Sequence, residues 1–154
     1  AECFPRFHFL KGDHMKSLST SMFAASLLIA AASASAEVVV VGSAKSAHSG
    51  LNKAQIADIF LGKTGSFPDG AQAIPVDIAD GSAQREEFHG KVTGKSGAQL
   101  KSYWSKLVFS GAATPPKEVP GGNEAKALIA ANPNAIGYLD KASVDGSLKV
   151  VLSP

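Results

Sequence analysis

A tight turn that leads into a helix is the segment of this sequence best suited to chemistry. Residues 77–88 read DIADGSAQREEF, in which Asp80 and Gly81 form the turn and Ser82 precedes the helix. The first amides of a helix have no intrahelical partner, and the helix dipole places partial positive charge beside them. Ser82 adds a hydroxyl, and Arg85 adds a cation one turn further on. The segment is a candidate cradle for an oxyanion, and a plain N-cap role for Ser82 is the alternative.

Two apolar runs predict the strands that hold this turn in place. Residues 73–79, AIPVDIA, predict the strand that delivers the turn, and the helix after it runs to about Val92. Residues Val38–Val41 are four consecutive valines, a pattern typical of a strand covered on both faces. Ser43, at the end of that strand, is a weaker candidate for contact with a ligand.

Two capping boxes predict the starts of two further helices. Asn52 is followed three residues later by Gln55, and Ser96 is followed in the same way by Gln99. Gly62 is placed to end the first of these helices. The second helix carries large apolar residues at helical spacing, which predicts core packing rather than a ligand platform: Leu100, Tyr103, Trp104, Leu107 and Val108.

The last third of the chain completes an alternating pattern. Residues 111–122 contain three prolines and are expected to form a loop, followed by a short helix over about residues 124–131. Strands are expected at Ala135–Leu139 and Leu148–Leu152. The order β-α-β-α-α-α-β-β predicts an α/β fold with a mostly parallel sheet flanked by helices.

Other kinds of chemistry find little support in the sequence. The segments GKT (62–64) and GKS (94–96) lack the first glycine of a nucleotide-binding P-loop. His48 and His89 have no metal-ligand spacing, and His48 is expected to be a solvated loop residue. Glu86 and Glu87 are expected to complement the helix dipole rather than act as an acid–base pair. We therefore expect no enzyme activity, no cofactor and no metal. The small net charge of +2, without a basic stripe, makes nucleic acid an unexpected partner.

The start of the sequence has the pattern of an export signal. Lys16 precedes the apolar run MFAASLLIAAA (22–32), and Ala34-Ser35-Ala36 follows it. We interpret residues 15–36 as a cleavable signal peptide, residues 1–14 as a non-native upstream extension, and residues 37–154 as the mature domain. An amphipathic anchor is the alternative for the extension, which holds the single cysteine, Cys3. The mature domain is expected in the periplasm, without a membrane span.

Four segments, in order, resemble one known family. They are LNKAQIADIFLGK (51–63), the FPDG turn (67–70), PVDIADGSAQREEF (75–88) and AIGY (135–138). This ordered set resembles the second lobe of the phosphate ABC transporter substrate-binding proteins, and it spans nearly all of residues 37–154. The resemblance implies a single lobe of a type 2 periplasmic-binding-protein fold.

The resemblance also implies a ligand set. In the family, a turn of the form R-x-D-G-S-G-T contributes to a phosphate that is held between two lobes. Asp80, Gly81 and Ser82 match this turn by position, whereas Ala83 and Gln84 replace its last two residues. We expect the Ser82 hydroxyl and the amides of Ala83 and Gln84 to hold the anion.

Two departures from the family pattern shape the functional expectation. The family arginine falls at Ile78, so Arg85 is the candidate countercharge, and the first lobe is missing. We expect a periplasmic domain that binds phosphate or a similar oxyanion and is linked to phosphate ABC transport or sensing. Its partners would be an ABC transporter permease or a second protein lobe. The alternative is a ligand-free interaction or regulatory module derived from one binding-protein lobe.

Overall fold

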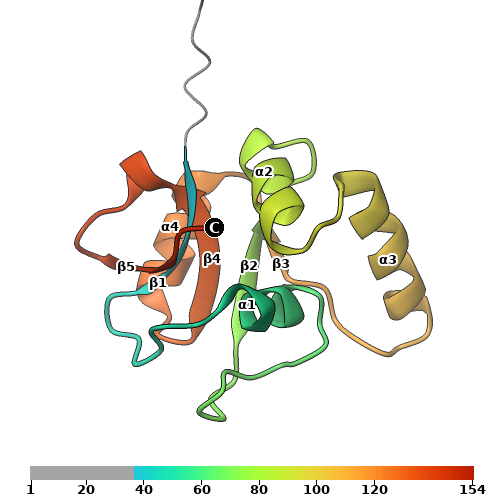
Figure 1. Ribbon diagram of the computed structural model, residues 1–154, viewed down its shortest axis with the longest axis horizontal. Helices are drawn as coiled ribbons and strands as arrows, with labels where there is room; N and C mark the ends of the chain where they lie inside the picture. The colour runs from blue at the N-terminus through green and yellow to red at the C-terminus, as the bar shows by residue number, and fades with distance from the viewer. Residues whose placement is uncertain (1–36) are drawn as a thin grey trace, which may run out of the picture. The chain divides into compact units, whose positions relative to one another are not determined.

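A computed structural model describes residues 37–154, so the expected signal peptide and upstream extension lie outside the described residues. Strands and helices alternate along this part of the chain (Figure 1). In chain order they are β1 (Val38–Ser43), α1 (Lys53–Phe60), β2 (Ile74–Ile78), α2 (Ala83–Val92), α3 (Gly97–Phe109), β3 (Lys117–Val119), α4 (Gly122–Ala131), β4 (Ala135–Asp140), a short 3-10 turn (Lys141–Ser143) and β5 (Leu148–Leu152).

The strands form one five-stranded sheet in the order β3-β2-β4-β1-β5. β2 pairs in parallel with β3 and β4, whereas β1 pairs antiparallel with both β4 and β5. Four strands therefore point one way and β1 opposes them. This confirms the α/β class with a mostly parallel sheet flanked by helices. Because β1 runs in the opposite direction, its C-terminal end lies at the opposite end of the strands from the C-terminal end of β2.

Helices cover both faces of the sheet. A side chain at Gly137 of β4 would collide with Ile129 of α4, whereas the next residue, Tyr138, stacks on Phe88 of α2 at 4.1 Å between ring centroids. Because successive strand residues point to opposite faces, α4 packs on one face and α2 on the other. Phe60 of α1 packs on the same side as Phe88, with 4.8 Å between their ring centroids.

The valine run forms the centre of the core, as its sequence predicts. Val38, Val39, Val40 and Val41 have no solvent exposure. The strand lies between β4 and β5, so both of its edges are paired and both of its faces are covered. A continuous β-branched run suits such a position because neither face needs a polar residue.

Both capping boxes are present. The Asn52 side chain accepts from the Gln55 amide at 2.8 Å, and the Gln55 side chain accepts from the Asn52 amide at 2.9 Å. Ser96 and Gln99 make the same reciprocal pair at the start of α3. Gly62 follows α1 with a positive φ of 67°, so the expected helix end is confirmed as well.

Strand β3 lies within residues 111–122, which the sequence predicted to be a loop, and that prediction was wrong at this point. Residues 117–119 pair in parallel with the outer edge of β2, and Ala79 N donates to Val119 O at 2.8 Å. The strand is too short to show a hydrophobic period, and prolines precede it. Its pairing with β2 decides its conformation.

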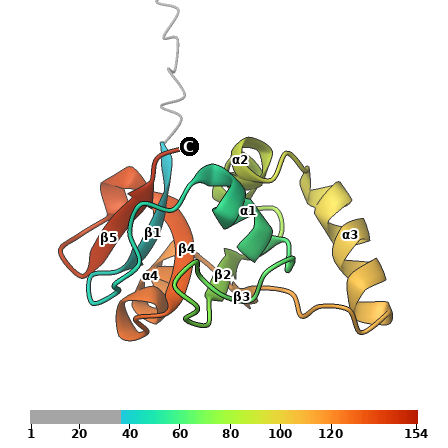
Figure 2. The same ribbon diagram turned by 60° about the horizontal axis from the view of Figure 1, so that its bottom comes forward.

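Helix α3 stands at one end of the domain, beyond α1 and α2, in both views (Figures 1 and 2). Leu100 and Trp104 are buried as predicted, but Val108 is 53% exposed and the following Phe109 is 96% exposed. The core role predicted for Val108 was therefore wrong. The helix packs mainly through its first two turns, and its last turn extends past the neighbouring elements.

The loop after β1 folds back on the turn after α1. His48 stacks on Phe67 with 3.9 Å between ring centroids, and its Nδ1 lies 2.7 Å from Asp69 Oδ2. The His48 side chain is only 8% exposed. The expectation of a solvated histidine was wrong because two loops distant in sequence meet here.

Candidate functional site

The turn between β2 and α2 has the shape that the sequence predicts. β2 ends at Ile78, and Gly81 adopts a φ of 85°, a conformation that favours glycine. Ser82 N donates to Ala79 O at 3.3 Å, which closes the turn immediately before α2 begins at Ala83. The start of α2 therefore lies at the C-terminal ends of the parallel strands.

Ser82 occupies the N-cap position without making the capping bond. Its side chain has no capping hydrogen bond, in contrast to Ser96, which accepts from the Gln99 amide. In residues 37–154, no group accepts a hydrogen bond from the amides of Ala83 or Gln84. A hydroxyl and two adjacent amides are thus free to bind the same ligand.

Gln84 is anchored on the side of the turn nearer the sheet centre. Its side-chain amide donates to Asp140 Oδ2 at the end of β4. Its side-chain oxygen also lies against Gly122, the first residue of α4. The other oxygen of Asp140, Oδ1, is buried and has no hydrogen-bond partner within the described part of the chain. These contacts fix the Gln84 side chain against β4 and α4.

Arg85 lies beneath the turn, among three carboxylates. Its Nη1 donates to Ile78 O at 3.2 Å, and its Nη2 lies 3.5 Å from Asp77 Oδ2. Nη1 also lies 3.6 Å from a Glu118 oxygen and 3.9 Å from an Asp80 oxygen. With 10% of its side chain exposed, Arg85 balances the negative charge of these residues within the chain.

Asp77, which contacts Arg85, belongs to a buried polar cluster with Tyr138 and His89. Tyr138 donates its phenolic hydrogen to Asp77, and His89 Nε2 lies 3.3 Å from both Asp77 oxygens. Burial, followed by the nearby Asp77 carboxylate, raises the pKa of Tyr138 well above its ordinary value. Sequence reasoning missed this cluster. Its one visible signal was Asp77, a charged residue inside an otherwise apolar strand.

Ser43 is far from the other candidate ligand residues. It lies at the C-terminal end of β1, which runs antiparallel to β4. Ser43 and Ser82 therefore lie at opposite ends of the strands of the sheet. Its hydroxyl donates to Ala130 O at 3.3 Å and accepts from Lys45 N at 3.2 Å. The structure thus brings together the residues from Asp80 to Arg85 and leaves Ser43 as a buried loop anchor.

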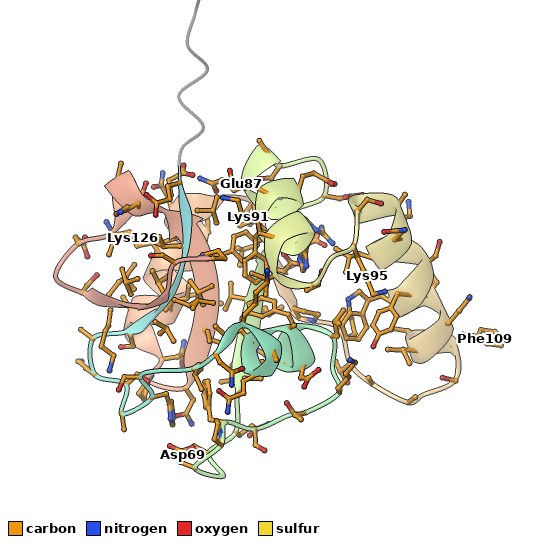
Figure 3. All side chains as sticks on the ribbon, in the orientation of Figure 1. Asp69, Glu87, Lys91, Lys95, Phe109 and Lys126 are labelled. Atoms are coloured by element: carbon orange, nitrogen blue, oxygen red, sulfur yellow. The ribbon has the colours of Figure 1, made fainter. Side chains whose placement is uncertain are left out.

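Figure 3 shows how side chains fill the described domain. Within residues 37–154, no three His, Cys, Asp or Glu side chains are grouped as metal ligands. In the same range, no helix has both the length and the apolar character needed to cross a membrane.

Comparisons with known proteins place this geometry in context. No family model and no curated protein matches the sequence. Among solved structures, a candidate phosphate ABC transporter substrate-binding protein with bound phosphate, from Clostridium perfringens, is 25% identical with a TM-score of 0.60. An ABC-type phosphate transport receptor from Vibrio cholerae is 17% identical with a TM-score of 0.59. A possible phosphate binding protein from Planctomyces limnophilus is 13% identical with a TM-score of 0.58.

Each of these matches covers 75% of this chain. The chain spans less than half of each solved protein: 44%, 45% and 40% in the same order. A match of this size agrees with the single lobe that the sequence predicts. The described domain therefore has the fold of a single lobe of the phosphate ABC transporter substrate-binding proteins.

Proposed function

We propose that this domain binds phosphate or a similar oxyanion at the start of α2. The observation that supports the proposal is the free Ser82 hydroxyl beside the free amides of Ala83 and Gln84. All three groups donate hydrogen bonds, and the helix dipole favours negative charge at this point. The Clostridium perfringens protein, which shares the fold, carries bound phosphate.

Arg85 contributes to this site through charge balance. Its guanidinium contacts Asp77 and lies near Asp80 and Glu118, so it offsets carboxylates that would otherwise repel an anion. The contact with Ile78 O also holds the guanidinium directly beneath the turn. Loss of Arg85 would leave the negative charges uncompensated and would weaken anion binding without removing any of the three donors.

A single lobe leaves one side of the anion in water. Each hydrogen bond made there competes with solvent and contributes about 0.5–1.5 kcal/mol. Three such donors together contribute about 1.5–4.5 kcal/mol, which corresponds to a Kd between about 80 mM and about 0.5 mM, so tight capture needs a second wall. We propose that the protein is exported to the periplasm and works beside a phosphate ABC transporter, whose permease or a second protein lobe supplies that wall.

Isothermal titration of the purified protein with phosphate, and with sulfate for comparison, tests the proposal. We expect saturable heat with phosphate, with an affinity that falls about 2- to 13-fold in Ser82→Ala and is unchanged in Ser110→Ala. Ser110 is a suitable control because its exposed hydroxyl only donates to Leu107 O at the end of α3. The absence of saturable heat with either anion up to about 100 mM would contradict the proposal and favour the interaction module.

A further inference from the structure

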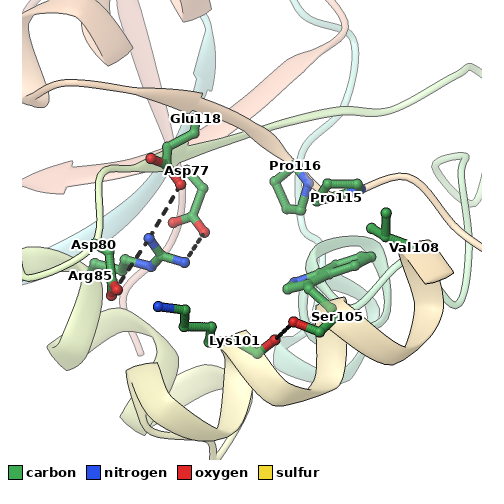
Figure 4. A pocket seen from close by; sticks show the side chains of 10 residues that line it. Asp77, Asp80, Arg85, Lys101, Ser105, Val108, Pro115, Pro116 and Glu118 are labelled. Carbon is green, nitrogen blue, oxygen red and sulfur yellow. Dashed lines mark hydrogen bonds and ion pairs between the residues drawn. The ribbon is translucent and has the colours of Figure 1, made fainter.

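A second pocket lies beside the turn, between α3 and the ends of β2 and β3. Its volume is about 360 Å³, within the range of pockets that hold small organic molecules. Charged side chains line one side of it, and apolar side chains of α3 and the following loop line the other (Figure 4). This mixture distinguishes it from the oxyanion cradle, which consists of neutral donors.

Two carboxylates at the pocket rim keep most of their hydrogen-bonding capacity. Asp80 and Glu118 are both 59% exposed in their side chains. The nearest cationic atom to each is Arg85 Nη1, at 3.9 and 3.6 Å, beyond ordinary hydrogen-bond length. Arg85 Nη1 lies between the two carboxylates (Figure 4), so an added ammonium group pairs with the exposed oxygens of one of them, and Glu118 lies on the same side as the prolines of the apolar wall.

Lys101 supplies the opposite charge. It lies on α3 and points into the same hollow as Asp80 and Arg85 (Figure 4). Within residues 37–154 it takes part in no ion pair, as is true of most lysines in this range, so its ammonium group is open to a ligand. The pocket therefore presents separate negative and positive groups to one ligand.

The remaining wall is apolar. Trp104 and Val108 of α3 line it together with Pro115 and Pro116 of the loop that follows. Val108 leaves 53% of its surface in water, which is unfavourable for an apolar side chain beside a concave surface. Covering such a surface gains about 25 cal/mol per Å² of apolar area. A ligand with an apolar group is stabilised here.

We propose that this pocket binds a small zwitterion with an apolar side chain, the chemistry of an α-amino acid. Its ammonium group pairs with Glu118, and its carboxylate pairs with Lys101. Its side chain packs against the apolar wall. The pocket shares Asp80 and Arg85 with the turn into α2, but the proposal does not rest on the oxyanion site, because Lys101 and the apolar wall take no part in that site and Ser82 does not line the pocket.

Ligands with one charge suit this pocket less well. An anion alone pairs with Lys101 but leaves the exposed Glu118 carboxylate without a new partner. A simple amine pairs with Glu118 but leaves the Lys101 ammonium without one. Only a ligand with both charges satisfies both sides of the pocket, which is why we favour a zwitterion over an organic anion or cation.

The test is titration of the purified protein with leucine, methionine and phenylalanine, followed by calorimetry or amide chemical shifts. Each has two analogues that lack one charge; for phenylalanine these are 2-phenylethylamine and 3-phenylpropanoate. We expect saturable binding of at least one of the three amino acids. Both matching analogues should bind about fivefold more weakly, as expected for the loss of one exposed charge pair.

Three variants assign the contacts. Lys101→Met should weaken amino-acid binding about fivefold and leave binding of the amine unchanged or stronger. Glu118→Gln should weaken both the amino acid and the amine. Lys106→Met is the matched control on α3, since Lys106 lies outside the pocket. All three side chains are exposed, so the variants should fold.

Several outcomes would overturn the proposal. One is the absence of saturable binding of all three amino acids up to about 10 mM. The others are equal affinity for an amino acid and its amine, and an unchanged affinity in Lys101→Met. Ser82→Ala separates the two sites: it should weaken phosphate binding about 2- to 13-fold and leave amino-acid binding unchanged. Phosphate binding without amino-acid binding would remove only the pocket proposal.

Discussion

The phenolic hydroxyl of Tyr138 on β4 donates to the carboxylate of Asp77 on the neighbouring strand β2. The same phenolic oxygen accepts from the Ile78 amide at 3.1 Å. Asp77 in turn contacts Arg85 and His89. Tyr138 therefore links the centre of the sheet to the residues that hold the turn into α2. It fixes the position of Asp77, which in turn contacts Arg85.

Removing this hydroxyl should destabilise the domain. Tyr138→Phe leaves the Ile78 amide unpaired and takes a donor from Asp77, both in a buried position. We expect a loss of about 1–3 kcal/mol in the free energy of unfolding, measured by urea denaturation. Tyr103→Phe is the control, because its partly buried hydroxyl donates only to Leu61 O. A loss no larger than in the control would contradict the role assigned to Tyr138.

The same residue predicts how stability falls at alkaline pH. Burial, with the Asp77 carboxylate nearby, raises the pKa of Tyr138, so the folded chain keeps a proton that the unfolded chain releases near pH 10. Its contribution is complete below about pH 10 and declines above it, by about 1.4 kcal/mol per pH unit. Urea denaturation at pH 9, 10 and 11 should show this decline in the wild type and a smaller one in Tyr138→Phe.

Arg85 should be essential for stability as well as for charge balance. Arg85→Met leaves the buried Asp77 carboxylate without its cationic partner. We expect a loss of about 3–5 kcal/mol, the usual effect of breaking a buried ion pair from one side. Lys91→Met breaks only an exposed pair with Glu87 and should change the free energy of unfolding by about 0.5 kcal/mol or less. Similar losses in both variants would show that Arg85 is dispensable to the fold.

Two serines at helix starts should respond differently to the same substitution. Ser96→Ala removes a capping bond to the Gln99 amide and should cost about 1 kcal/mol in thermal or urea unfolding. Ser82→Ala removes a hydroxyl without a capping bond and should change stability by only a few tenths of a kcal/mol. A large loss in Ser82→Ala would mean that this residue serves the helix rather than a ligand.

Gly62 should tolerate substitution less well than Gly50. Both have a positive φ, 67° and 72°, so alanine is strained by about 1–2 kcal/mol at either position. A methyl group at Gly62 would also lie 2.7 Å from the Trp104 ring, whereas at Gly50 it would meet nothing within 4 Å. Gly62→Ala should therefore lose more stability in urea denaturation, and equal losses would show that the Trp104 ring moves freely.

The local elements followed from the sequence because their causes are local. Asn52 and Ser96 begin helices through bonds to residues three positions away, and the valine run of β1 needs no distant information to be recognised as a buried strand. The turn from Asp80 to Ser82 was equally visible, since glycine and the start of a helix determine it within a few residues.

What the sequence could not provide were contacts between distant segments. β3 exists because β2 offers it an edge, and His48 is buried because two loops meet. The reversed direction of β1 separates Ser43 from Ser82, although both follow strands. Each of these outcomes depends on strand pairing, which a single sequence does not reveal.

The sequence by itself determined the α/β pattern, the helix starts and the oxyanion-type turn, all of which depend on short-range hydrogen bonding and hydrophobic period. Only the tertiary structure decided the environment of the turn. It placed Asp77, Arg85, His89 and Tyr138 in one buried cluster, and it set α3 across from Asp80 and Glu118 to form a pocket. The physical reason is that charges and cavities arise from side chains that become neighbours only when the sheet assembles.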